Sequence, residues 1–452
     1  MRTSEPTIDF SKGFTSQADI FGRKRLYELM MRFVRNSPNT GLVMAIDDKW
    51  GNGKTSFLKM LSSEIKNNDE LGVNVIYYDA FENDYHTDPF VSLSAEIYQT
   101  LNGKESKLDS IKESFVNTGK KVGANLLKGG VSYAITAMTG NLVSGTALEG
   151  MKETFANSIS DPIEKYVEEK IKSSERDKTE LINFKNVLHE IYTKSGRKTL
   201  LIIDELDRAR PDFSLDLLER IKHIFSVEGF IFLLSVNREQ FEKSIEQRYG
   251  MIDSRTYLNK FVHFWFTLPK NNVLSKGCIN GTTPSTMSLQ FSQLDNGVNF
   301  LSRNGTIIKT LSYLLDVNGC SLREAERCYS LMNAIDNKEA VGNFSSYVYH
   351  SLMALVVYLK VVNPKLLNDI KERNLTKNDV IVGLGIRETD AMEELEVMQL
   401  IHLLDYHFAT LEELSIARTE KRFSDIEMFN YGNQKRDLFE QMNDVIEHLH
   451  IG

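Results

Sequence analysis

Short, nearly continuous apolar runs alternate with longer amphipathic segments through residues 1–270. The runs with the length of a strand are 42–46, 73–81, 199–204, 230–237 and 261–269. A strand that helices cover on both faces reads as an unbroken apolar run, and strands that alternate with helices form parallel sheets through right-handed crossovers. The pattern therefore predicts an α/β domain, with a parallel sheet flanked by helices.

Two segments around the first strand have the spacing of a helix with one apolar face. They cover residues 18–35 and 56–67. The apolar positions are Leu26, Leu29, Met30 and Phe33 in the first segment, and Phe57, Leu58, Leu61 and Ile65 in the second. Residues three and four apart share a helical face, so each set is predicted to form the apolar face of an amphipathic helix.

The pattern changes beyond residue 269. Residues 271–287 are rich in turn formers, and the rest of the chain reads almost entirely as amphipathic helices. One of them, 321–335, opens with a capping box in which Ser321 is paired with Glu324. We therefore expect a boundary near residue 270, with an α/β domain over 1–270 and an all-α C-terminal region over 271–452.

An excursion over about 102–198 separates the second and third predicted strands and is far longer than an ordinary crossover. We interpret it as a mainly helical insertion. Within it, residues 129–148 carry no charge over the length of a membrane span. Several serines, threonines and glycines make this run more polar than a leucine-rich span, which argues against a membrane. The other interpretation is a small-residue helical hairpin packed on the core or on another subunit.

Charge and cysteine content limit the partners and the compartment. The chain has 452 residues, a formal net charge of -8 and three cysteines. An acidic chain has no general attraction for nucleic acid or anionic lipid, although a local basic surface leaves nucleic acid open as a partner. The scattered cysteines form neither a disulfide framework nor a zinc cage, and no apolar leader follows the N-terminus, so we expect a cytoplasmic protein.

The loop after the first strand has the chemistry of a phosphate-binding loop. It reads "WGNGKT" over residues 50–55, between a predicted strand and a predicted helix. The glycines let backbone N–H groups turn toward phosphate oxygens, and the helix adds the positive end of its dipole. Lys54 is expected to reach the terminal phosphates and Thr55 to hold Mg²⁺. The predicted nucleotide-binding set is Trp50, Gly51, Asn52, Gly53, Lys54, Thr55 and Ser56.

The loop departs from the pattern G-x-x-x-x-G-K-[ST] at its first position, which is Asp48. Aspartate tolerates unusual backbone angles better than most residues, so we expect the loop to form. A carboxylate there repels phosphate, however, so the substitution raises the question of whether the site turns nucleotide over.

Polar residues follow two later strands. Asp204, at the end of 199–204, is expected to hold the Mg²⁺ shell, and Glu205 beside it to orient and deprotonate the attacking water. Asn237 ends the strand over 230–237. We predict that it senses the terminal phosphate or positions water; the alternative is an ordinary turn former.

Taken together, these segments resemble the KAP family of P-loop NTPases. The matching segments are "ADIFGRKRLY", "WGNGKT", "YYDAFENDYHTDPF", "IIDELDRARPD", "FLLSVNREQF" and "YLNKFVHFWFTLP", in that order over about 19–269, with "SLREAERC" beyond them. The departures are Asp48 at the first loop glycine and Glu205 where the acidic pair is often completed by a second aspartate.

The resemblance implies several further features. A strand lies between the phosphate-loop strand and the strand that ends in Asp204, and the insertion falls where many members carry two membrane helices. Arg323 is implied to be a lid residue that reaches the nucleotide, the alternative being an exposed salt-bridge former. Arg208 and Arg238 are candidates for an arginine finger that completes a neighbouring subunit's site.

The sequence thus predicts an ATPase that depends on Mg²⁺. We expect the nucleotide state to switch assembly of a homo-oligomer or the action of a protein partner, and the resemblance favours bacterial defence against phage or plasmids. ATP is favoured over GTP because no N-K-x-D motif follows the fourth strand. The alternatives are a nucleotide-binding scaffold that does not hydrolyse, against which Glu205 argues, and a membrane-associated organiser that uses residues 129–148.

Overall fold

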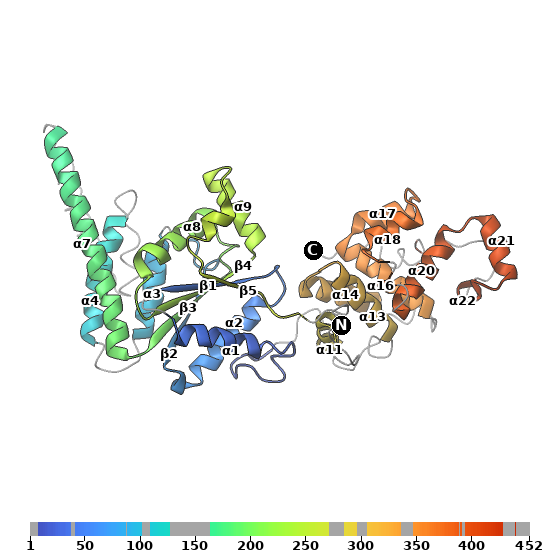
Figure 1. Cartoon of the computed structure of the whole chain (residues 1–452), viewed down its shortest axis with the longest axis horizontal. Helices are drawn as coiled ribbons and strands as arrows, with labels where there is room; N and C mark the ends of the chain where they lie inside the picture. The colour runs from blue at the N-terminus through green and yellow to red at the C-terminus, as the bar shows by residue number, and fades with distance from the viewer. Residues whose placement is uncertain are drawn as a thin grey trace. The chain divides into compact units, whose positions relative to one another are not determined.

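We analysed a computed structural model of the chain (Figure 1). It describes residues 8–37, 41–86, 88–101, 109–126, 163–270, 284–295, 305–335, 347–387, 389–390, 394–427 and 439. The uncharged run 129–148 lies outside these residues, so its role as a hairpin or a membrane span stays a prediction. Among the described helices, none combines the length and the apolar character that crossing a membrane requires.

The residue contacts divide the chain into two units. The sheet unit comprises Asp9–Asp48 and Lys54–Leu268. The helical unit comprises Met1–Ile8, Lys49–Gly53 and Pro269–Gly452. The loop residues that follow the first strand are therefore grouped with the C-terminal region, and each unit is described by itself below.

The sheet unit contains a parallel five-stranded sheet, as the apolar runs predict. Its strands are β1 (Leu42–Asp47), β2 (Val73–Asp79), β3 (Lys198–Asp204), β4 (Phe230–Val236) and β5 (Phe264–Phe266). Their order is β2-β3-β4-β1-β5, and every neighbouring pair is parallel. Strand β4 therefore lies between the loop strand β1 and the strand β3 that ends in Asp204, as the family resemblance implies.

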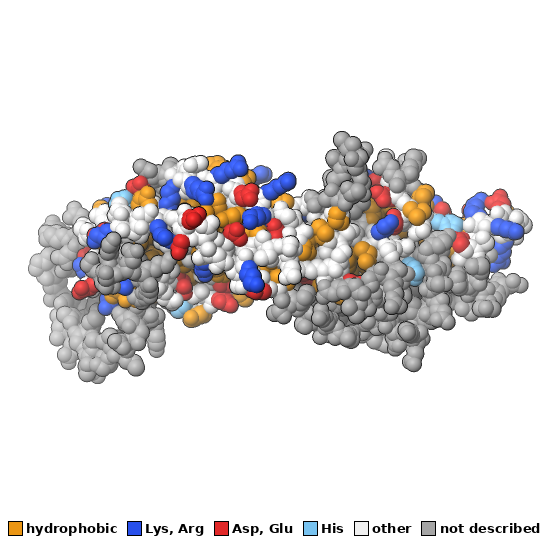
Figure 2. Space-filling view, turned by 90° about the horizontal axis from the view of Figure 1, so that it is seen from below, with side chains coloured by type: hydrophobic (Ala, Val, Ile, Leu, Met, Phe, Trp, Pro, Cys, Tyr) orange, Lys and Arg blue, Asp and Glu red, His pale blue; other side chains and the backbone are white. Residues whose placement is uncertain are grey.

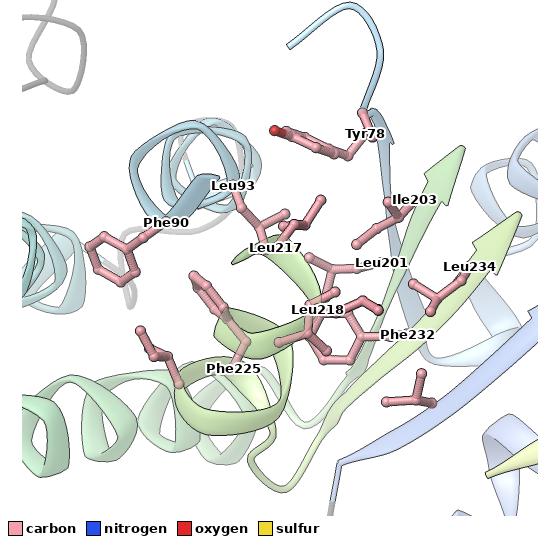
Figure 3. Close-up of a cluster of buried hydrophobic side chains, with 14 of the residues drawn as sticks. Tyr78, Phe90, Leu93, Leu201, Ile203, Leu217, Leu218, Phe225, Phe232 and Leu234 are labelled. Carbon is pink, nitrogen blue, oxygen red and sulfur yellow. The ribbon is translucent and has the colours of Figure 1, made fainter. Parts of the chain in front are cut away.

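Alternate residues of these strands build one core on each face of the sheet. On one face, Met44 and Ile46 of β1 pack with helices α1 (Lys24–Arg35) and α2 (Lys54–Lys66). On the other, Val43 and Ala45 pack with α3 (Pro89–Leu101), α8 (Pro211–Arg220) and α9 (Arg238–Tyr249). Figure 1 shows these helices on the two sides of the strands, and Figure 3 shows the second core, where Leu201 and Phe232 of the strands lie with Leu217 and Leu218 of α8. The fold is a three-layer α/β sandwich.

The first helix is shorter than the sequence pattern predicts. Residues 18–23 form turns, because both carboxylate oxygens of Asp19 accept backbone N–H groups, from Arg23 at 2.7 Å and from Lys24 at 2.9 Å. The helix then begins at Lys24. Its buried face includes Met30 but not Leu29, which is 41% exposed although it shares the apolar spacing.

The insertion is helical where the structure describes it. Helix α4 (Asp109–Leu126) packs against α7 (Ile163–Ser195), with Phe115 and Phe184 in contact at 5.2 Å between ring centroids. Both rings belong to the second core. Elsewhere in the sheet unit, α8 continues into a π-helical turn at Ile221–Phe225, and a short α10 (Ser254–Leu258) precedes β5.

The helical unit contains no strand among its described residues. Its helices are α11 (Thr286–Asp295), α13 (Gly305–Val317), α14 (Leu322–Ile335), α16 (Tyr347–Val362), α17 (Pro364–Lys371), α18 (Lys377–Gly383), α20 (Leu395–Phe408), α21 (Leu411–Thr419) and α22 (Ser424–Glu427). The predicted capping box of α14 is confirmed: Ser321 N donates to Glu324 Oε2 at 2.6 Å, and Glu324 N donates to Ser321 Oγ at 3.3 Å. The region after the sheet is therefore all-α, as predicted.

Candidate nucleotide site

The loop between β1 and α2 has the backbone that a phosphate-binding loop needs. Gly51 has a φ of 84° and Gly53 a φ of 78°, both in the left-handed region where a side chain is strained. The helix that follows begins at Lys54, so Thr55 and Ser56 lie in its first turn, where backbone N–H groups have no partner within the helix. Gly51 and Gly53 thus have backbone conformations that glycine adopts without strain.

Lys54 is almost fully buried, with 8% of its surface exposed. Its ammonium donates to the backbone oxygen of Asp48 at 2.5 Å. Burial lowers the pKa of Lys54, and the nearby carboxylates of Asp207, Asp48 and Asp204 act in the opposite direction. The structure therefore brings Lys54 close to Asp204 at the end of β3 and to Asp207 beyond it.

Asp204 ends β3 and is buried, with 1% of its surface exposed. Its Oδ2 accepts the hydroxyl of Tyr77 at 2.6 Å, and its Oδ1 accepts the backbone N–H of Glu205 at 2.9 Å. Burial, and then the carboxylate of Asp204, raises the pKa of Tyr77, so the phenol keeps its proton. Tyr77 belongs to the aromatic segment of the sequence, but the sequence gives no sign that it bonds to Asp204.

Glu205 stands in an uncommon backbone conformation, with a φ of 55°. Non-glycine residues in this region cost free energy and cluster at functional sites. Its Oε1 accepts from Arg208 Nη1 at 2.6 Å. Burial raises the pKa of Glu205, and the charge of Arg208 acts in the opposite direction. Arg208, a finger candidate, thus contacts the carboxylate of its own chain.

Asn237 lies at the start of α9, where its side-chain oxygen accepts the backbone N–H of Gln240 at 3.4 Å. This is the contact of a helix cap. Its own backbone N–H donates to Asp207 Oδ2 at 2.9 Å, which ties the end of β4 to the loop after β3. The side-chain amide nitrogen is the group that a phosphate-sensing role would use.

Asp207 and Asp79 are two acidic residues that the sequence analysis did not assign to the site. Among the nearby charges, that of Asp207 has the largest effect on the pKa of Lys54. Asp79 ends β2 directly opposite Asp204 in the strand register. Burial raises the pKa of Asp79, and Asp204 adds to the effect. The signal available in the sequence was their position: Asp79 follows the last apolar residue of β2, and Asp207 stands three residues after Asp204.

Asp48 is buried, with 8% of its surface exposed, and its backbone N–H donates to the carbonyl of Val236 at 3.2 Å. A second buried charge, Arg23 of α1's N-terminal turn, is 1% exposed. Burial lowers the pKa of Arg23 to about 10, and the charges of Asp48 and Asp19 oppose that effect. The carboxylate that replaces the first loop glycine therefore interacts with a buried guanidinium.

Within the helical unit, loop residues 49–53 contact the turn before α14. Lys49 Nζ donates to the carbonyl of Gly319 at 2.8 Å, and Asn52 Oδ1 accepts the N–H of Leu322 at 3.2 Å. Gly51 lies so close to Arg323 that an added Cβ would be 2.4 Å from the Cβ of Arg323. The side chain of Arg323 is exposed, and Trp50 is 40% exposed.

Comparison with known proteins places this architecture in a family. The model of the KAP family P-loop domain matches residues 23–276, which is more than half of the chain. The chain belongs to the KAP family. This KAP chain is 18% identical over 376 residues to the phage T7 exclusion protein of Escherichia coli (strain K12), an alignment that covers 81% of the chain. It spans about half, 48%, of the length of that relative.

Solved structures with partial similarity include the Aeropyrum pernix ORC2 protein in ADPNP-ADP complexes, at 12% identity and a TM-score of 0.34, over 99% of this chain and 96% of that one. Cdc6p from Pyrobaculum aerophilum matches at 12% identity and a TM-score of 0.29, over 95% of this chain and 93% of that one. Scores this low add nothing to the fold assignment, which rests on the strand order and the family match.

The second finger candidate of the KAP chain, Arg238, also contacts its own chain. Its Nε bonds to Glu242 Oε1 at 2.8 Å, and its guanidinium stacks on the ring of Trp265 at 4.5 Å. Only 17% of the side chain is exposed. Each finger candidate thus has a carboxylate partner on its own chain.

The surface carries both signs of charge. On the face seen in Figure 2, Lys and Arg side chains are interspersed with Asp and Glu side chains over the described residues. Across the described ranges, no group of three His, Cys, Asp or Glu side chains has an arrangement that would hold a metal ion. A Mg²⁺ ion in a phosphate site does not need one, because it is bound by one or two protein oxygens together with phosphate and water.

Proposed function

We propose that this KAP chain is an ATPase that depends on Mg²⁺. The observation that carries the proposal is the placement of Lys54: it begins the helix after a loop with two left-handed glycines, and it lies beside the carboxylates at the end of β3. Bound phosphate would offer the ammonium an anionic acceptor in place of the backbone oxygen of Asp48. ATP, rather than GTP, remains our choice on the sequence argument alone.

The donor atoms fit Mg²⁺. Thr55 supplies a hydroxyl from the first turn of α2, and Asp204 supplies a carboxylate whose rotation two hydrogen bonds restrict. Hard oxygen ligands of this kind are the ones that Mg²⁺ prefers. When bound, Mg²⁺ would neutralise charge that develops on the phosphate oxygens.

Glu205 is the proposed base that orients and deprotonates the attacking water. Burial raises its pKa, which makes the carboxylate a stronger base than one in free solution. The contact with Arg208 fixes one oxygen and leaves the other for water. Asn237 is proposed to position water or phosphate through its amide nitrogen, since its oxygen caps α9.

We further propose that the nucleotide acts as a switch, for assembly of copies of this chain or for a partner protein. The contacts that support a role for the helical region are those of loop residues 49–53 with residues 319–323, including the close approach of Gly51 to Arg323. We therefore retain Arg323 as a proposed nucleotide-binding residue. Bacterial defence is the proposed setting, and the similarity to a phage exclusion protein supports it. A cytoplasmic location is proposed on the sequence argument.

A nucleotide-binding scaffold that does not hydrolyse is the second candidate. The buried Asp48 favours it, because a carboxylate at the first loop position opposes phosphate binding. The charge of Arg23 and the presence of Glu205 favour the ATPase instead.

Phosphate release from ATP by the purified chain, measured over a range of protein concentrations with Mg²⁺ and with EDTA, tests the proposal. We expect turnover with Mg²⁺ and none with EDTA, and turnover per chain that rises with concentration if copies assemble. Tight ATP binding without phosphate release at any concentration would favour the scaffold.

A further inference from the structure

Among the described residues, Tyr77 is the one whose side chain donates a hydrogen bond to Asp204. Tyr77 lies on β2, the edge strand beside β3, and pairs in register with Ile202, two residues before Asp204. From there its hydroxyl donates to Asp204 Oδ2 at 2.6 Å. This length is that of a charge-assisted hydrogen bond between a hydroxyl and a carboxylate, which is about twice as strong as a neutral one.

The other oxygen of Asp204 is held from the opposite direction. The backbone N–H of Glu205 donates to Asp204 Oδ1 at 2.9 Å. Each carboxylate oxygen accepts more than one bond, so each keeps an acceptor position for a metal ion or a metal-bound water. The two donors therefore fix the plane of the carboxylate without using up its capacity to bind.

We propose that Tyr77 is a positioning residue for the divalent metal ion of the nucleotide site: its hydroxyl orients the Asp204 carboxylate toward the ion. The inference rests on the proposed function, because it takes Asp204 as the metal-binding carboxylate. Outer partners of this kind fix the orientation of a metal ligand, and their removal costs about 10- to 100-fold in metal affinity.

The neighbouring residue on the same strand provides a matched control. Tyr78 also ends in a buried hydroxyl with a 2.6 Å partner, but that partner is Ser92 Oγ of α3. Its ring points into the core on the other face of the sheet, as Figure 3 shows. Tyr77→Phe and Tyr78→Phe thus each remove one hydroxyl and one hydrogen bond from β2, and only the first change touches Asp204.

Mn²⁺ serves as the probe because electron paramagnetic resonance counts free Mn²⁺ directly. The affinity for Mn²⁺ is measured in the presence of saturating ADP, and the affinity for a fluorescent ADP analogue is measured in EDTA. We expect Tyr77→Phe to weaken Mn²⁺ binding about 10- to 100-fold and to leave the affinity in EDTA unchanged within about twofold. Tyr78→Phe should change neither quantity, while the melting temperatures of the two variants fall by similar amounts.

Equal Mn²⁺ affinity in Tyr77→Phe and the wild type would overturn the proposal, and so would an equal loss in Tyr78→Phe. These results do not depend on turnover. A wild type that binds ADP and Mn²⁺ but never hydrolyses ATP would contradict the ATPase while a selective loss in Tyr77→Phe still supported the metal role. A wild type that binds no Mn²⁺ with ADP would overturn both.

Discussion

The body of the sheet, meaning the interiors of its strands, is apolar. Its carboxyl edge, where the same strands end, is acidic. In the body, strands such as β4 are buried along their whole length and apolar on both faces, apart from Ser235. At the edge, β1, β2 and β3 each end in aspartate, at Asp47, Asp79 and Asp204. Asp79 and Asp204 lie opposite each other in the strand register. At this edge, burial lowers the pKa of Lys54 and raises the pKa values of Glu205 and Asp79.

This difference separates residues that stabilise the fold from residues that form a site. Apolar strand interiors lower the free energy of the folded state whatever the protein does. Carboxylates that are buried together raise it, because each loses hydration and repels its neighbours. A bound cation would offset this repulsion, which fits the Mg²⁺ that we propose at that edge, and substitutions in the two regions should have separable effects.

The largest expected effect is on stability, from a substitution in the body of the sheet. Phe232 is fully buried in β4, so Phe232→Ala should cost about 3–5 kcal/mol of unfolding free energy through lost burial and a cavity. Asp204→Asn at the edge keeps the side chain's shape and weakens two hydrogen bonds while it relieves repulsion, so it should change this free energy by no more than about 1 kcal/mol. Urea unfolding measures both. Equal losses would mean that the edge is as structural as the body.

Next is the loop. Gly51→Ala places a side chain at a φ of 84° and against Arg323, and we expect nucleotide affinity to fall about tenfold or more, which corresponds to about 1.4 kcal/mol. Gly72→Ala is the control: its φ is 62°, but a Cβ there meets nothing within 4 Å. Binding of a fluorescent ATP analogue is the measurement. An equal fall in both variants would show that the loss comes from general backbone strain.

The contact of Arg208 with Glu205 predicts that Arg208 acts within its own subunit. Arg208→Ala removes a charge-assisted hydrogen bond of about 1.5 kcal/mol, so turnover should fall about tenfold. Mixing Arg208→Ala chains with Lys54→Ala chains should restore nothing, because no chain then has both residues. Recovery of turnover in the mixture would instead identify Arg208 as a finger that serves a neighbouring subunit.

The smallest effect is expected at Asp48. Since Arg23 offsets its charge, Asp48→Gly should raise nucleotide affinity and turnover by no more than about threefold, which is under 1 kcal/mol. Titration with the fluorescent analogue and a phosphate-release assay measure the two quantities. A rise in turnover of two orders of magnitude would indicate that Asp48 suppresses hydrolysis in the natural chain and would favour the scaffold.

The sequence predicts the sheet well because its signal is repeated along the strands. Nearly continuous apolar runs before Asp47, Asp79 and Asp204 identify buried parallel strands, and the family resemblance implies that another strand lies between the loop strand and the strand that ends in Asp204, where the structure has β4. The start of α1 is missed because Asp19 forms two side-chain bonds to the backbone, which compete with a helical turn. The hydrophobic periodicity of a sequence does not reveal such side-chain hydrogen bonds.

The residues of the candidate site are predicted by type and spacing, but their pairings are not. A glycine loop followed by Lys54 and an acidic pair after a strand are local patterns. The bonds from Tyr77 to Asp204 and from Asn237 to Asp207 join residues 127 and 30 positions apart in the chain. They depend on strand order and register, which bring the ends of β2, β3 and β4 to one edge. Only the folded chain reveals them.

The most direct test of the central claim compares the wild type with Lys54→Ala and Glu205→Gln in two assays, ATP binding and ATP turnover. The account predicts that Lys54→Ala loses both, because the ammonium binds the phosphates, and that Glu205→Gln keeps binding while turnover falls by at least about 100-fold. Wild-type turnover in Glu205→Gln, or unchanged binding and turnover in Lys54→Ala, would contradict a nucleotide site at the carboxyl edge of this sheet.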